Sequence, residues 1–133
     1  MTIKTINPAA LYDGAPIGMS QATMDTDSGL VFVSGQVDWD INSQLKNNDI
    51  EAQTRGAIDN LARVLEAANS SIDHVLHLRA YVRGELSDHM DKIVPIFAAS
   101  FGQSRPALTG IGVASLASPD TLIEIEAVAK LAR

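Results

Sequence analysis

The sequence contains no cysteine, and this absence excludes several kinds of chemistry at once. Disulfide bonds, zinc thiolate sites and cysteine nucleophiles all require the thiol group. Nothing therefore indicates an oxidising compartment, and the cytoplasm is the expected location. Residues 1–18 lack the basic start and apolar run of a signal peptide, and no apolar run approaches the roughly 18 residues that span a bilayer. No membrane partner is expected.

Positive charge and aromatic residues are also scarce. The 133 residues include 10 Lys and Arg against 16 Asp and Glu, which gives a net charge of -6. Affinity for nucleic acid rests largely on Lys and Arg that displace counterions from phosphates. Aromatic side chains, on which bases stack, make up only 5% of the chain. Nucleic acid is therefore not an expected partner.

Apolar residues are plentiful, at 46% of the chain, which is enough for a packed core. The length suits one domain over residues 1–133, because no Pro/Gly/Ser-rich linker or charge run divides it. Such a domain is expected to fold without a cofactor.

Apolar periodicity predicts six strands and two helices in the order βββαβαββ. The expected strands are residues 3–6, 21–25, 30–37, 74–83, 108–113 and 122–131. The first two are short and are expected at sheet edges, whereas the third is expected in the centre. The turn at 117–120 predicts that the last two strands form a hairpin. Within 74–83, alternation puts Val75 and His77 on one face and Leu76 and Leu78 on the other.

The first helix is expected to begin at a capping box of Asn48 and Glu51 and to end near Asn69. The second is expected to begin near Val94, because Pro95 disfavours a longer helix, with residues 88–93 as a separate turn and Gly102 as its stop.

These elements predict an α+β fold: one six-stranded mixed sheet with both helices on one face. The last strand carries apolar residues on both of its faces. Burial of the helix-free face against other subunits is the natural explanation.

Two groups of side chains are candidates for chemistry. His74 and His77 resemble a metal-binding pair. Residues three apart on a strand point to opposite faces, however, so the two side chains cannot share one ion and no metal site is expected. Glu124 and Glu126 share one face of the last strand. If both were buried there, their like charges would raise the pKa of one carboxyl, which would suit acid or base catalysis. The alternative is that both are solvated or paired with arginines, namely Arg79, Arg83 or Arg105.

Five segments together resemble the RidA/YjgF family, also labelled L-PSP endoribonucleases or translation-initiation inhibitors. They are Ser20-Gln21-Ala22, residues 31–36, residues 57–61, Arg105-Pro106-Ala107 and residues 123–129. The resemblance implies a chorismate-mutase-like subunit that assembles as a homotrimer with pockets between subunits. Family deaminases hydrolyse imines and enamines to a keto acid and ammonia, and they need no cofactor or metal.

The resemblance also implies a site. The family's acidic residue corresponds to Glu124, and its pocket wall corresponds to Ser34, Gly35 and Gln36. These residue types are retained, so Glu124 is expected to position or activate water for attack on a C=N carbon.

Three other pocket positions depart from the family pattern. Leu108 replaces the arginine that clamps the substrate carboxylate, Met19 replaces a tyrosine, and Gly110 replaces a cysteine or similar residue. Arg105 precedes Leu108 by three residues and is expected on the opposite side of the strand, unless a bend at Pro106 redirects it.

The sequence therefore favours a Rid-type imine or enamine deaminase with altered specificity for a small-molecule ligand. A non-catalytic trimer that binds a metabolite or acts in regulation is the alternative, because three pocket positions differ. An endoribonuclease ranks last, given the acidic charge balance.

Overall fold

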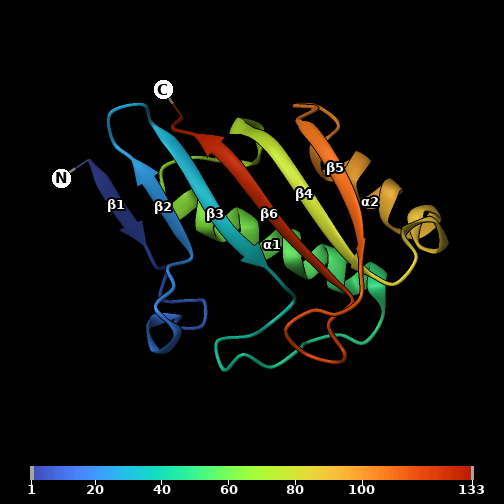
Figure 1. Ribbon diagram of the computed structural model, residues 1–133. Coiled ribbons are helices and arrows are strands. Elements are labelled where there is room, and N and C mark those ends of the chain that lie inside the picture. The colour runs from blue at the N-terminus through green and yellow to red at the C-terminus, as the bar shows by residue number, and fades with distance from the viewer. Residues whose placement is uncertain (1, 133) are drawn as a thin grey trace.

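The computed structural model describes residues 2–132, which form one sheet with both α-helices on the same face (Figure 1). The strands are β1 (Ile3–Ile6), β2 (Ala22–Asp25), β3 (Leu30–Gln36), β4 (Val75–Arg83), β5 (Ala107–Val113) and β6 (Ile123–Lys130). Their order in the sheet is β1-β2-β3-β6-β4-β5. Every neighbouring pair is antiparallel except β4 and β5. The predicted α+β class and six-stranded mixed sheet are confirmed.

The predicted C-terminal hairpin is wrong. β5 pairs in parallel with β4, and β6 lies in the middle of the sheet between β3 and β4. The physical reason is burial: alternate residues of β6 from Ile123 to Ala129 are buried, whereas β5 is largely exposed and suits an edge. The turn at 117–120 joins the two strands in sequence without pairing them.

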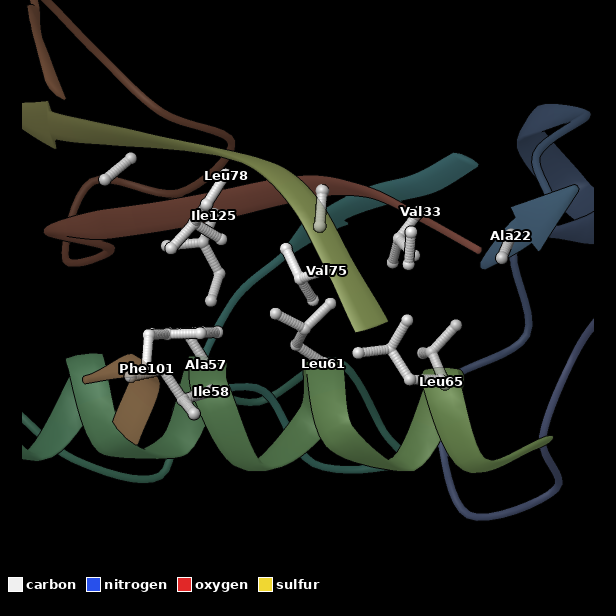
Figure 2. Close-up of a cluster of buried hydrophobic side chains, with 14 of the residues drawn as sticks. Ala22, Val33, Ala57, Ile58, Leu61, Leu65, Val75, Leu78, Phe101 and Ile125 are labelled. Atoms are coloured by element: carbon white, nitrogen blue, oxygen red, sulfur yellow. The ribbon is translucent and has the colours of Figure 1, made fainter. Parts of the chain in front are cut away.

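Helix α1 (Ile50–Ala67) packs its apolar stripe against the centre of the sheet. In Figure 2, Leu61 of α1 points toward Val75 of the sheet and Leu65 points toward Val33, and all four side chains are buried. The helix starts one residue later than predicted: the cap is Asp49, whose side chain accepts a hydrogen bond from the Ala52 amide. Its end is as expected, because Asn69 adopts the left-handed conformation with φ 58.

Helix α2 (Met90–Phe101) begins four residues earlier than the predicted Val94 and continues through Pro95. Pro95 lies on an exposed part of the helix, so the carbonyl that loses its amide partner remains accessible to water. The predicted separate turn is shorter and earlier, as the 3₁₀ helix η3 (Leu86–Asp88). The expected stop is confirmed at Gly102. Two further 3₁₀ turns are η1 (Ala15–Ile17) and η2 (Ile72–His74).

A bulge near the start of β4 reverses the predicted faces of Val75 and Leu76. Val75 pairs with Ala129 and His77 with Val128, so Leu76 is the extra residue of the pair of strands. Val75 is consequently buried, at 5% exposure, and Leu76 is 46% exposed. From Leu78 onward the strand alternates as expected.

No helix within residues 2–132 is long and apolar enough to cross a membrane.

Candidate functional site

The helix-free face of β6 carries two glutamates in different surroundings. Glu126 accepts hydrogen bonds from the Tyr81 hydroxyl and from Arg79, whose Nη1 lies 3.3 Å from Oε1. Glu124 forms no ion pair within residues 2–132. Burial raises the pKa of the Glu124 carboxyl, and the negative charge of Glu126 raises this pKa further. Glu126 is therefore the glutamate that pairs with Arg79, and Glu124 is the carboxyl that remains available to act as an acid or a base.

A bulge in β3 brings Gly35 against Glu124. Val33 lies opposite Ala127 and Gln36 opposite Ile125, so β3 has one more residue than β6 in this stretch. A Cβ atom on Gly35 would lie 2.6 Å from Cδ of Glu124, well inside contact distance. Any other residue at position 35 would force the carboxyl to move from this position.

The other predicted wall residues have distinct places. The Ser34 hydroxyl donates to the Ser20 carbonyl at 2.7 Å, which ties the bulge to the segment before β2. Gln36 is only 2% exposed, and its amide donates to Oε1 of Gln21 at 2.9 Å. Because Gln36 pairs with Ile125, it belongs to the buried side of the sheet. Gln36 therefore supports the wall from behind.

Met19 lies beside an aromatic pair, Tyr12 and Trp39, that no sequence pattern predicts. The Tyr12 hydroxyl donates to the Met19 sulfur over 4.0 Å, and the Tyr12 ring lies 5.5 Å from the Trp39 ring. Burial raises the pKa of the Tyr12 phenol, and the negative charge of Glu124 raises it further. Tyr12 and Met19 lie in irregular segments, where no periodicity predicts a contact.

Leu108 and Gly110 lie at the other edge of the sheet. They pair with Leu78 and Ala80, so they belong to the helix-covered face of β5. Leu108 is nevertheless 55% exposed, because β5 is the edge strand and α2 covers it incompletely.

Arg105 does not lie on the opposite side of a strand from Leu108, because β5 begins only at Ala107. It has a left-handed backbone with φ 50, and its amide donates to the Phe101 carbonyl at 2.8 Å, which closes the end of α2. Arg105 and Leu108 line the same cavity, which has a volume of about 240 Å³. The expectation that residues three apart point to opposite sides of a strand fails here, because it holds only within a regular strand.

The predicted site residues thus form two groups that do not meet within one chain. Gly35 and Glu124 lie on the helix-free side of β3 and β6, whereas Leu108 and Arg105 border the helix side of β5. β4 separates the two groups, and they face opposite sides of the sheet.

No cluster of three His, Asp or Glu residues within residues 2–132 could hold a metal ion. His74 shares a 2.7 Å hydrogen bond with the Ser71 hydroxyl through Nδ1. His77 lies 3.4 Å from the Thr109 hydroxyl through Nε2. The two histidines therefore have separate partners.

The chain resembles known proteins both in sequence and in fold. Residues 15–131 match the family model described as Endoribonuclease L-PSP. A RutC family protein of Pyrococcus horikoshii is 34% identical, with 86% of this chain and 88% of that protein covered. The 3-aminoacrylate deaminase RutC of Acinetobacter baylyi is 33% identical, with 90% and 94% covered. The crystal structure of YEO7 from yeast is 26% identical, with 98% and 100% covered and a TM-score of 0.88.

The fold and the matched residues define a small α+β protein of the L-PSP type. The chain belongs to the RidA/YjgF family.

Proposed function

We propose that this protein is a Rid-type hydrolase that converts a small imine or enamine to a carbonyl compound and ammonia. The observation that carries the proposal is Glu124, a carboxyl that has a raised pKa and no ion pair with any residue from 2 to 132, and that lies against Gly35 on an open sheet face. The 3-aminoacrylate deaminase RutC, which is 33% identical, supports a deaminase of the same general kind.

The reaction requires one base and a correctly positioned substrate. As water attacks the C=N carbon, Glu124 accepts a proton from it and passes a proton to the nitrogen. The resulting carbinolamine loses ammonia as the C–N bond breaks and the C=O bond forms. One imine and one water thus give one carbonyl compound and one ammonia. A pKa above the ordinary glutamate value strengthens the carboxylate as a base near neutral pH.

We also propose that the pocket forms between subunits of a homotrimer. The separation of Glu124 from Leu108 supports this, because only a second chain could bring such positions together. The helix-free face supports it as well: Phe32 is 47% exposed there, opposite the half-buried Val128. Burial of such apolar side chains is what an obligate interface supplies.

Specificity is expected to differ from that of a general imino acid deaminase. An aliphatic side chain at Leu108 cannot make the paired hydrogen bonds that arginine makes to a carboxylate. The same substitution, with Met19 and Gly110, supports the second candidate, a non-catalytic trimer that binds a metabolite. An endoribonuclease, the activity in the family model's description, is disfavoured by the net charge of -6.

The decisive experiment measures ammonia release from freshly generated imines by the wild type, Glu124→Gln and Leu108→Arg. The matched control is Glu66→Gln, which changes an exposed carboxylate on α1. If the protein is a hydrolase, the wild type and the control accelerate release and Glu124→Gln does not. Acceleration by Leu108→Arg alone would contradict the proposal and favour the non-catalytic binding protein.

A further inference from the structure

Tyr81 of β4 lies directly across from Glu124 of β6 on the helix-free face of the sheet. The two strands are neighbours (Figure 1), and cross-strand partners place their Cβ atoms roughly 4.5–5.5 Å apart. Ala80 and Val82, on either side of Tyr81, are buried under the helices, so the Tyr81 ring is on the same side of the sheet as the Glu124 carboxyl. Both side chains are half-buried. A ligand bound at Glu124 therefore borders Tyr81.

The proton of the Tyr81 hydroxyl is already engaged. The hydroxyl donates to Oε1 of Glu126, and Nη1 of Arg79 lies 3.3 Å from the same oxygen. An ionised carboxylate can only accept hydrogen bonds, so the tyrosine is the donor. This hydrogen bond also raises the pKa of the Tyr81 phenol, so the hydroxyl keeps its proton at neutral pH. The remaining lone pairs of the Tyr81 oxygen can only accept a hydrogen bond from a ligand.

Glu124 is also free to accept. It forms no ion pair within residues 2–132, and Arg79 pairs with Glu126 instead. Arg83, the next residue of β4 on this face, donates to two loop carbonyls at 3.2 and 3.4 Å. The Glu124 carboxyl and the Tyr81 oxygen are therefore two acceptors on neighbouring strands that remain available to a ligand.

Two such acceptors suit the nitrogen end of an imine. The nitrogen carries one N–H in a neutral imine and two in an iminium ion or a carbinolamine. The carbonyl product has an oxygen in its place, which carries no hydrogen to donate. A site that accepts a hydrogen bond from N–H discriminates against an analogue that lacks it. Because the Tyr81 hydroxyl donates to a carboxylate, its oxygen is also a stronger acceptor than an isolated phenol.

We propose that the Tyr81 oxygen accepts a hydrogen bond from the substrate nitrogen while the Glu124 carboxylate acts on the attacking water. Tyr81 is then a further catalytic residue, because it contacts the substrate directly. The pair selects ligands that carry N–H at this position over the corresponding carbonyl compounds, so the product loses one contact once ammonia has left. The inference rests on the proposed function, since it assigns a residue and a ligand group to the same site.

Stable cations test the inference without turnover. Acetamidinium resembles a protonated imine in its planar C=NH₂⁺ group, whereas tetramethylammonium has the same charge and no N–H. NMR titration of the full chain would measure the affinity of each cation for the wild type, Tyr81→Phe and Glu124→Gln. We expect Tyr81→Phe to weaken acetamidinium roughly two- to tenfold, the value of one hydrogen bond, and to leave tetramethylammonium unchanged. Glu124→Gln is expected to weaken both cations, because it removes the negative charge.

Thr109→Val is the matched control. Thr109 pairs with Arg79, so its exposed hydroxyl lies on the same face of the sheet, one strand further from β6. Its removal is expected to change neither affinity. Equal weakening of both cations by Tyr81→Phe would show that the tyrosine acts only by holding Glu126, and weakening of neither would show that it makes no ligand contact. Either result overturns the inference, as does acetamidinium binding that Glu124→Gln leaves unchanged.

Ammonia release separates this inference from the proposed function. Release by the wild type, with acetamidinium affinity unaffected by Tyr81→Phe, would leave the hydrolase intact and remove the role of Tyr81. Binding of acetamidinium that depends on Tyr81, without ammonia release, would retain the N–H site and remove the hydrolase. If both hold, Tyr81→Phe lowers kcat/KM roughly two- to tenfold and leaves inhibition by the carbonyl product unchanged, because the product oxygen makes no hydrogen bond with Tyr81.

Discussion

Gly35 and Glu124 are in direct contact across the β3–β6 pair, so that a side chain at position 35 and the carboxyl at position 124 would compete for the same space. Gly35→Ala is therefore expected to displace the carboxyl and to lower kcat/KM for ammonia release at least tenfold. The check is a double-mutant cycle with Glu124→Gln. If Gly35→Ala lowers activity further in the Glu124→Gln background, the glycine acts on something other than the carboxyl.

The charge of Glu126 is expected to set part of the pH dependence. Because Glu126 raises the pKa of Glu124, replacing it with glutamine lowers that pKa. A base loses activity as the pH falls through its pKa, so the acidic limb of kcat/KM moves to lower pH in Glu126→Gln. A limb that stays in place would assign it to another group. Lys130→Gln, on an exposed part of β6, is a control for a general change in charge.

The raised pKa of Glu124 also predicts how the folding stability changes with pH. The folded state binds a proton at Glu124 more readily than the unfolded state does, so the stabilising contribution of the protonated carboxyl is complete below the unfolded pKa. It is lost as the pH rises through the folded pKa. Glu124→Gln is therefore expected to be more stable than the wild type at neutral pH, with the difference vanishing at acidic pH. Denaturant titrations at both pH values test this, and a wild type that is more stable at neutral pH would contradict it.

Tyr12→Phe isolates the phenol hydroxyl beside Met19. The hydrogen bond to the sulfur is long, at 4.0 Å, and the ring packing on Trp39 is retained, so the loss of stability should stay below about 1 kcal/mol. If the hydroxyl helps to orient a ligand, kcat/KM falls by roughly two- to tenfold, the value of one hydrogen bond. Unchanged kinetics would limit Tyr12 to a packing role.

Val75 and Leu76 provide a stability test of the β4 bulge. Val75→Ala removes two buried carbon atoms and is expected to cost about 1.5–2.5 kcal/mol. Leu76→Ala removes an exposed side chain and should cost less than about 0.5 kcal/mol. Urea denaturation measures both values. Regular alternation along β4 would give the reverse order of costs.

Those two residues also show what the sequence could and could not predict. Apolar periodicity correctly placed Leu61 and Leu65 on the buried stripe of α1, because a regular helix repeats its faces without interruption. Two-residue alternation likewise correctly placed Glu124 and Glu126 on one face of β6. A bulge breaks this rule, and no residue type before Val75 indicated one.

The site was predictable only in part for a related reason. Gly35 and Glu124 were named from the family resemblance, yet their contact depends on a register shift between two strands. The shared cavity of Arg105 and Leu108 depends on where α2 ends and β5 begins, and a backbone with φ 50 at arginine is not what its residue type favours. Tyr12 meets Met19 through loop geometry that leaves no periodic signal.

The central position of β6 has a consequence for synthesis of the chain. β3 and β4 are neighbours only through β6, so the sheet remains two separate pieces until residues 123–130 have left the ribosome. Until then the edges of β3 and β4 are unpaired and the stripe of α1 lacks the strand that covers its centre. Nascent chains are therefore expected to stay open and dependent on chaperones, and to complete the sheet only after residue 130 has emerged.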